Sequence, residues 1–219
     1  MEHNQKTVVY QSTNVYETLN TLSHKTKNIW LVFHGMGYLS RYFLKYFKTL
    51  NPEENYIIAP QAPSKYYLGT DFKHVGASWL TKESTGQEIE NVLNYVTAVV
   101  KAEKIPADKR FILFGFSQGV SIALRWLAKC RYNHDQLILY AGGIPNELNK
   151  NDLSFLTAKK SQIKIIYGDA DIYLTEERLK VEAEKIKNLF GNKAQVINFK
   201  GEHEIKTEIL EAIATEGYD

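Results

Sequence analysis

The segment Arg110–Cys130, RFILFGFSQGVSIALRWLAKC, joins a strand-like run directly to a helix-like run. Ser117 stands at the junction, with Gly115 two residues before it and Gly119 two residues after it. A strand that turns sharply into a helix brings its backbone close to neighbouring chain, and glycine leaves room because it has no Cβ atom. The pattern predicts a sharp turn that presents the Ser117 hydroxyl at a helix N-terminus, where free N–H groups favour a nearby negative charge.

The G-x-S-x-G motif alone carries limited information, because glycine and serine are common residues. The alternative interpretation is an idle serine in a small-residue turn. Partner residues decide between the two, because a serine hydroxyl is a poor nucleophile until a base takes its proton and a further group orients that base.

Two later strand-like segments are followed by suitable partners. IKIIYG is followed by DADIYLTEE, which contains Asp169 and Asp171, and AQVINF is followed by KGEHEI, which contains His203. No histidine other than His203 follows position 134, so it is the predicted base. Asp169 comes directly after the strand, where it could serve the turn. Asp171 lies further into the loop, from which it can reach back to the imidazole, and it is the preferred acid.

Acyl transfer also needs two N–H donors aimed at the developing oxyanion. The N–H of Gln118, directly after the serine, is one candidate. The stretch IWLVFHGMGYLS, residues 29–40, offers the other, since its glycines let the loop approach closely. The N–H of Met36 is the first candidate there and that of Gly37 the second. His34 is interpreted as fixing this loop through a hydrogen bond.

The glycines at 35 and 37 also resemble a degenerate dinucleotide-binding fingerprint. The third glycine is missing, and the next strand ends in Pro-Gln rather than in the acidic residue that would hold a ribose. No H-E-x-x-H motif, cysteine pair or carboxylate cluster with metal-ligand spacing occurs. We therefore expect neither a cofactor nor a metal.

Strand-length apolar runs recur along the chain and are mostly continuous rather than alternating, which is typical of strands covered on both faces. They occupy residues 6–11, 28–33, 55–59, 110–116, 136–141, 163–168 and 194–199. The two earliest are expected to pair antiparallel at one edge. Amphipathic stripes predict helices after residue 84, before Gly191 and near the C-terminus, with Ser84 or Thr85 capping the first.

Strands that alternate with helices predict an α/β fold, with a mostly parallel sheet and helices on both faces. Residues 1–219 are expected to form a single domain, because no linker or repeat divides them. Residues 60–83 do not fit the alternation, and a loop of that length is usually functional. In an open parallel sheet, loops after strands line the ligand crevice.

Composition limits the function classes. The formal net charge is +2, and the densest basic runs are pairs, which argues against a nucleic-acid partner. No apolar stretch is long enough to span a membrane, and the N-terminus lacks the apolar segment of a signal peptide. The lone cysteine, Cys130, excludes an internal disulfide and suits a reducing compartment. We therefore expect a cytoplasmic protein, with a homodimer allowed.

The motifs LVFHGMG, APQAP, GFSQG, GDAD and GEH, with a tryptophan at 79, occur in the order found in the phospholipase/carboxylesterase group. The chain resembles this group, which includes acyl-protein thioesterases and small bacterial esterases, over roughly residues 28–214. The resemblance implies an α/β-hydrolase three-layer sandwich with no large lid domain. It also implies a serine carboxylesterase that acts on small-molecule ester or acyl substrates. Its implied catalytic residues are Ser117, Asp171 and His203, with oxyanion donors at Met36 and Gln118.

The departures from the family pattern touch the pocket rim rather than the triad. Tyr38 follows Gly37 where the family often has aspartate, Val120 replaces a glycine, and IYLTEE replaces a proline-containing segment. The predicted substrate-contacting residues are Trp79, Gly37, Tyr38 and Ile172, and the aromatic residues that could extend this surface are Tyr66, Tyr67 and Phe72. Thioesterase or lysophospholipase activity, and a binding protein with weak turnover, are the alternatives.

Overall fold

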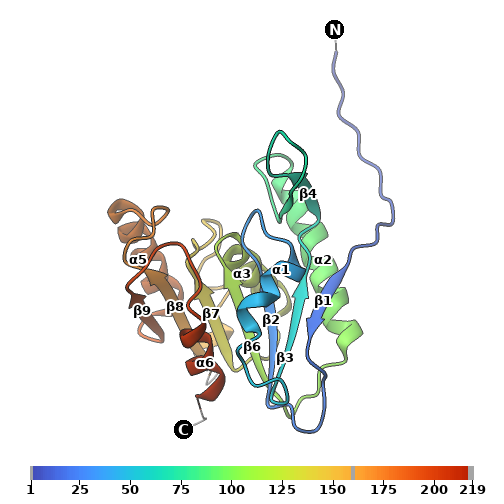
Figure 1. The fold of residues 1–219 in the computed structure, drawn as a ribbon. Helices are drawn as coiled ribbons and strands as arrows, with labels where there is room; N and C mark the ends of the chain where they lie inside the picture. The colour runs from blue at the N-terminus through green and yellow to red at the C-terminus, as the bar shows by residue number, and fades with distance from the viewer. Residues whose placement is uncertain (1, 159–160, 217–219) are drawn as a thin grey trace.

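A seven-stranded sheet forms the centre of the computed structural model, which describes residues 2–158 and 161–216 (Figure 1). The strand order is β1-β3-β2-β6-β7-β8-β9, and every neighbouring pair is parallel except β1 and β3. The strands are β1 Tyr16–Leu19, β2 Asn28–Phe33, β3 Asn55–Pro60, β6 Arg110–Phe116, β7 Gln136–Tyr140, β8 Gln162–Gly168 and β9 Ala194–Phe199.

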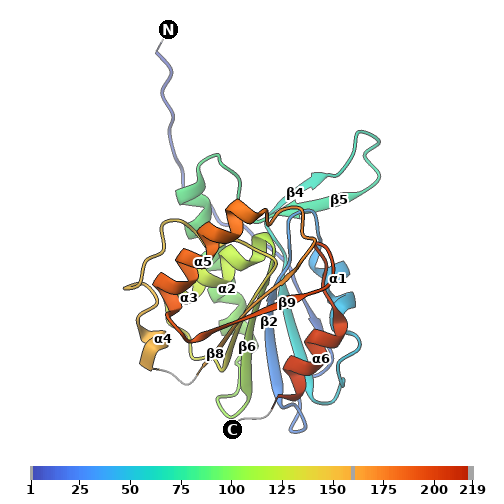
Figure 2. The ribbon, with the colours of Figure 1, turned by 90° about the vertical axis from the view of Figure 1, so that its left-hand side faces the viewer.

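Helices cover both faces of this sheet, as Figure 2 shows with the sheet turned towards its edge. One face carries α2 Thr85–Glu103, α3 Gln118–Cys130, α4 Phe155–Ala158 and α5 Glu176–Phe190. The other face carries α1 Ser40–Phe43, the 3-10 helix η1 Leu44–Phe47 and α6 Thr207–Thr215. The prediction of a mostly parallel three-layer α/β fold is confirmed.

The two-sided cover explains why the strand sequences are continuously apolar. Along β2, Ile29, Leu31 and Phe33 belong to the core under α2 and α3, whereas Trp30 and Val32 belong to the core under α1 and α6. All five side chains are fully buried. Because successive strand residues point to opposite faces, a strand between two helical layers needs apolar residues at every position.

The prediction of a strand at residues 6–11 is wrong. Val8, Val9 and Tyr10 are 80%, 99% and 80% exposed, and the segment extends away from the domain without strand pairing (Figure 1). The first strand is β1, and it pairs antiparallel with β3 rather than with β2. An antiparallel edge is therefore present, but β3 separates it from β2. A short apolar run predicted a strand, although it has no sheet edge to join.

Residues 60–83 are not an irregular loop throughout. They contain a hairpin of β4 Ser64–Tyr67 and β5 Val75–Ser78, which projects beyond the carboxyl edge of the main sheet (Figure 2). Ser84 occupies the predicted N-cap position of α2, but it has a left-handed conformation and makes no side-chain capping bond. The helix that ends before Gly191 agrees with the prediction.

The described residues contain neither a helix that could span a membrane nor a cluster of metal ligands. None of the helices there has the length and apolar character needed to cross a membrane. Within the same residues, no group of three or more His, Cys, Asp or Glu side chains is arranged to hold a metal ion. In the part of the chain that the structure describes, the hairpin projects beyond the carboxyl edge of the sheet, and no large lid domain is evident.

Candidate active site

Ser117 lies at the sharp turn between β6 and α3. Its backbone has φ 53° and ψ −119°, a conformation that L-residues rarely adopt. Its N–H donates to the carbonyl oxygen of Tyr140 at 2.8 Å, which ties the turn to the end of the neighbouring strand β7. Such backbone strain costs about 1–3 kcal/mol and persists only where the surrounding structure fixes it.

Three glycines make this turn sterically allowed. A Cβ atom on Gly119 would lie 2.1 Å from the carbonyl oxygen of Phe33, and one on Gly115 would lie 2.6 Å from that of Gly119. A Cβ atom on Gly142, in the loop after β7, would lie 2.3 Å from the carbonyl oxygen of Ser117. All of these contacts involve backbone atoms, so the neighbouring chain could not yield cheaply. The motif glycines were evident in the sequence, whereas Gly142 was not.

Asp171 and His203 meet at the same edge of the sheet. Oδ2 of Asp171 lies 2.7 Å from Nδ1 of His203, and Oδ1 accepts the N–H of Tyr173 at 2.9 Å. The Asp171 side chain is fully buried, whereas that of His203 is 19% exposed. An imidazole whose Nδ1–H is held by a carboxylate presents Nε2 as an acceptor, which is the tautomer that a general base needs.

Asp169 occupies a different position. Its Oδ1 accepts the N–H of Gly201 at 3.0 Å, and its own N–H donates to the carbonyl of Phe199 at 2.9 Å. These bonds join the loop after β8 to the loop after β9. A Cβ atom on Gly168 would lie 2.3 Å from the carbonyl oxygen of Gly201, so the two loops are in close contact there. The structure thus places Asp171, rather than Asp169, against the imidazole of His203.

Aromatic rings hold His203 on two sides. The centre of its ring lies 5.0 Å from that of Phe116 and 4.8 Å from that of Tyr173, which meets it edge-on. The N–H of Lys206, three residues later, donates to the hydroxyl of Tyr140 at 3.0 Å. Tyr140 therefore contacts both sides of the site, since its carbonyl also holds the N–H of Ser117.

Ser117 and His203 line one cavity of about 400 Å³ at this edge. Met36, Tyr38 and Gln118 line it too. The remaining lining residues are Gly35, Phe116, Ser121, Ala141, Gly142, Gly143, Tyr173, Leu174 and Arg178.

Three of the predicted substrate-contacting residues do not line this cavity. Gly37 and Ile172 lie outside it although Met36 and Tyr173 beside them contribute. Trp79 is fully buried in the core, and its Nε1–H donates to the carbonyl of His34 at 2.8 Å. Its place is in the wall that supports the loop 34–37.

The two predicted oxyanion donors are available. In the part of the chain that the structure describes, the N–H groups of Met36 and Gln118 donate to no other protein atom. The N–H of Gly37, in contrast, donates to the carbonyl of Ala77 at 2.8 Å. Met36 is therefore better placed than Gly37 to supply a donor.

The Gln118 side chain fixes the segment beside the elbow, which is the sharp turn at Ser117 between β6 and α3. Its Oε1 accepts the N–H of Trp79 at 2.8 Å, and its Nε2 donates to the carbonyl of Leu80 at 2.8 Å. Both ends of the side-chain amide are therefore engaged. The residue after the serine therefore couples the elbow to the end of the hairpin segment.

His34 supports the opposite wall. Its Nδ1–H donates to the carbonyl of Gly35 at 2.8 Å, and its Nε2 accepts the N–H of Ala62 at 3.2 Å. Burial lowers the pKa of His34 to about 4, with the Gly35 bond opposing the shift. The ring is neutral near pH 7 and fixes the loop, as its position in the sequence suggested.

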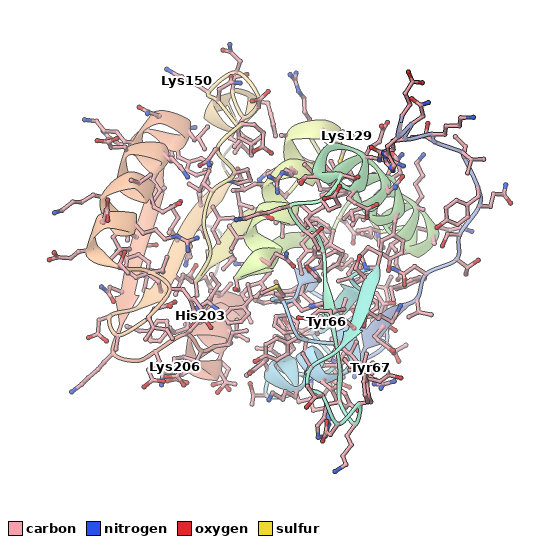
Figure 3. The ribbon with its side chains drawn as sticks, turned by 90° about the horizontal axis from the view of Figure 1, so that it is seen from above. Tyr66, Tyr67, Lys129, Lys150, His203 and Lys206 are labelled. Carbon is pink, nitrogen blue, oxygen red and sulfur yellow. The ribbon has the colours of Figure 1, made fainter. Side chains whose placement is uncertain are left out.

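The aromatic residues of the hairpin lie outside the cavity. Tyr66, Tyr67 and Phe72 are 40%, 56% and 69% exposed. The rings of Tyr67 and Phe72 pack edge-on, with their centres 5.1 Å apart. Figure 3 looks down on the carboxyl edge and shows the two tyrosines on the hairpin, apart from His203.

Sequence reasoning missed several cavity residues. Gly142 and Gly143 follow strand β7, and this glycine pair at a strand end was the available signal. Tyr173 lies two residues after Asp171, close enough in sequence to be considered. Arg178 had no signal, because a charged residue in the first turn of an amphipathic helix is ordinary.

A mostly parallel sheet with a strained serine between strand and helix, followed by an aspartate and a histidine after later strands, defines an α/β-hydrolase. A family model described as Phospholipase/Carboxylesterase matches residues 16–216. The chain belongs to this family, and membership indicates an ester-hydrolysing enzyme. A comparison with curated protein sequences gave no match.

Solved structures support the fold. Zea mays acyl-protein thioesterase 2 is 16% identical, with a TM-score of 0.68 and coverage of 92% of this chain and 96% of that one. Esterase PE8 is 22% identical, with a TM-score of 0.67 and coverage of 93% and 97%. A phospholipase/carboxylesterase from Dyadobacter fermentans is 19% identical, with a TM-score of 0.62 and coverage of 95% and 99%.

Proposed function

We propose that the protein is a serine carboxylesterase that hydrolyses carboxylic esters through an acyl-enzyme on Ser117. The observation that carries this proposal is the 2.7 Å bond between Asp171 and His203, at a cavity that Ser117 also lines. The proposed roles are nucleophile for Ser117, general base and acid for His203, and orienting acid for Asp171.

The proposed reaction follows from these roles. The Ser117 hydroxyl attacks the ester carbonyl while Nε2 of His203 takes its proton, and the N–H groups of Met36 and Gln118 bind the oxyanion. His203 then protonates the leaving alcohol, which departs as the acyl-enzyme forms. Water repeats the sequence and releases the acid. Every step uses protein groups and water, so the proposal requires no cofactor.

Thioesters fall within the same proposal. A thiol leaves the tetrahedral intermediate more readily than an alcohol does, so the same groups suffice. Zea mays acyl-protein thioesterase 2 shares the fold at 16% identity, which supports including thioesters among the substrates to be assayed. A panel of matched p-nitrophenyl esters and acyl thioesters tests which class has the higher kcat/KM.

The decisive experiment replaces the proposed nucleophile. Ser117→Ala should lower hydrolysis of p-nitrophenyl acetate by at least about 10⁴-fold and abolish labelling by a fluorophosphonate. Ser121 is the matched control, because it lines the same cavity while its hydroxyl donates to the Gln118 carbonyl at 2.8 Å. Ser121→Ala should still be labelled. Retained turnover and labelling in Ser117→Ala would refute the proposal.

A further inference from the structure

The cavity beside Ser117 contains one permanent charge. Of its lining residues in the described part of the chain, Arg178 is the only aspartate, glutamate, lysine or arginine. His203 is the other group that can carry a positive charge. No carboxylate lines the cavity, and the two carboxylates beside it, Asp171 and Glu182, are bonded to His203 and Lys185. An anion entering the cavity therefore meets one positive and no negative side chain among the lining residues.

Arg178 is held in place from two sides. It lies in the first turn of α5, where its backbone N–H donates to the Thr175 hydroxyl at 3.3 Å. Its Nη1 donates to the carbonyl of Tyr173 at 3.0 Å, and the Tyr173 ring packs edge-on against His203. The guanidinium is therefore attached to the same loop that carries Asp171.

The guanidinium also lies against the glycine pair next to the elbow. Nη2 of Arg178 would be 2.6 Å from a Cβ atom on Gly143, whereas a Cβ atom on Gly142 would meet the carbonyl of Ser117. The absence of a side chain at 143 thus lets the charge approach the elbow. The nearest atom to this Cβ is the end of a flexible side chain, so a methyl group there would displace the guanidinium rather than the backbone. The next atom is Oε1 of Glu182, at 3.2 Å.

Nearby cations already have carboxylate partners. Arg125 pairs with Glu147 at 2.6 Å and Lys185 with Glu182 at 3.2 Å, both in the adjoining polar cavity. Arg178 also reaches that cavity, which Glu177 lines as well.

Arg178 itself forms no ion pair within the described residues. One of its five N–H donors serves Tyr173, which leaves a planar set that matches the two oxygens of a carboxylate or phosphate.

We propose that Arg178 is a specificity-determining residue that selects esters bearing a carboxylate or phosphate on the acyl or the alcohol part. The inference rests on the proposed esterase function and adds a substrate class to it. The anion would lie against Nη2 and Nε while the ester carbonyl faces Ser117. Arg178 is exposed to solvent, which weakens a charge-assisted pair, so we expect it to discriminate by about 10-fold between charged and neutral substrates.

The test compares kcat/KM for substrates of equal length. The acyl arm uses mono-p-nitrophenyl adipate against p-nitrophenyl hexanoate, and the alcohol arm uses 4-acetoxybenzoate against its methyl ester. In at least one arm, Arg178→Gln should lower the charged-to-neutral ratio by about 10-fold, and Arg178→Lys should lower it less, since lysine keeps the charge without the planar donors. The arm that changes shows which part of the substrate carries the anion.

Two further variants separate binding from general effects. Gly143→Ala should lower the same ratio without removing any charged side chain, because its methyl group displaces the guanidinium. Lys180→Gln removes one positive charge from α5 two residues further on, at an exposed position outside the cavity, and should leave the ratio within about 2-fold. Thermal unfolding of each variant shows whether it is folded.

The outcomes are distinguishable. Suppose that the wild type and Arg178→Gln both hydrolyse neutral esters through Ser117 and have the same charged-to-neutral ratio in both arms. Arg178 then only holds the Tyr173 carbonyl. That result overturns the inference about Arg178 and leaves the esterase function standing. If the folded wild type hydrolyses none of the four esters, both proposals are overturned.

Discussion

Nδ1 of His203 lies 2.7 Å from Oδ2 of Asp171, although 32 residues separate them in the chain. Two loops make this possible, one after β8 and one after β9, and parallel pairing of these strands brings both loops to the same edge. Close contact at Gly168 keeps the loops together. The geometry gives the aspartate and the histidine a fixed relation before any substrate arrives.

Asp171→Asn should be far more damaging than Asp169→Asn. The amide at 171 would favour the wrong imidazole tautomer, and we expect kcat for p-nitrophenyl acetate to fall by about 10⁴-fold. Asp169 is exposed, and an amide oxygen there can still accept the Gly201 N–H, so the loss should stay below about 10-fold. The reverse ranking would transfer the orienting role to Asp169.

Gly119→Ala should destabilise the protein although alanine is normally the better helix residue. Its Cβ atom would meet the Phe33 carbonyl at 2.1 Å, and we expect a loss of about 3 kcal/mol or more in the free energy of unfolding. Gly86→Ala in α2 is the control, because nothing lies within 4 Å of its Cβ, and it should stabilise by up to about 1 kcal/mol. Urea unfolding measures both; equal effects would contradict the steric argument.

Stability should fall as the pH drops from 7 to 5, partly because of His34. Its pKa is about 4 in the folded protein and about 6.5 when unfolded, so the unfolded state binds more protons between these values. The contribution is fully present above pH 6.5 and is lost as the pH falls towards 4. From this group we expect a decrease of about 2 kcal/mol between pH 7 and pH 5.

The His34→Gln variant tests this assignment, because glutamine does not titrate. Urea unfolding at both pH values should show a smaller pH dependence than in the wild type. The same replacement at the exposed His24 is the control and should leave the wild-type dependence in place. An unchanged pH dependence in His34→Gln would assign the effect to other groups.

Trp79→Phe should lower the stability of the folded protein without changing its preference for acyl chain length. The Trp79 side chain is buried and donates to the His34 carbonyl, so phenylalanine leaves that acceptor unpaired at a cost of about 1–3 kcal/mol. A series of p-nitrophenyl esters from acetate to octanoate measures the preference, and thermal unfolding measures the stability. A shifted chain-length optimum would restore Trp79 to the substrate-contacting wall.

The sequence was most informative where one residue type has one physical purpose. Continuous apolar runs predicted the central strands, since strands between two helical layers cannot alternate. The motif around Ser117 predicted the turn because glycines were needed there for steric reasons that the structure makes explicit. The preference for Asp171 followed from its reach, and the structure places it against His203.

The sequence failed where packing among distant segments decides. Residues 6–11 have strand-like composition but no partner edge, and composition alone does not reveal an edge. Trp79 is an aromatic residue of the kind that often lines a pocket. Whether its ring faces a cavity or the core, however, depends on neighbours from other segments. Nothing in the sequence singled out Arg178. Its proposed role became visible only from the cavity, whose lining residues include Arg178 and no carboxylate.

The positive φ of Ser117 has a consequence for how this chain would change under selection. Glycine adopts that conformation without strain, so Ser117→Gly should raise the unfolding temperature while removing the proposed nucleophile. A screen for heat resistance alone would therefore favour an inert variant. Any selection for thermostable variants of this protein must therefore also select for catalytic turnover.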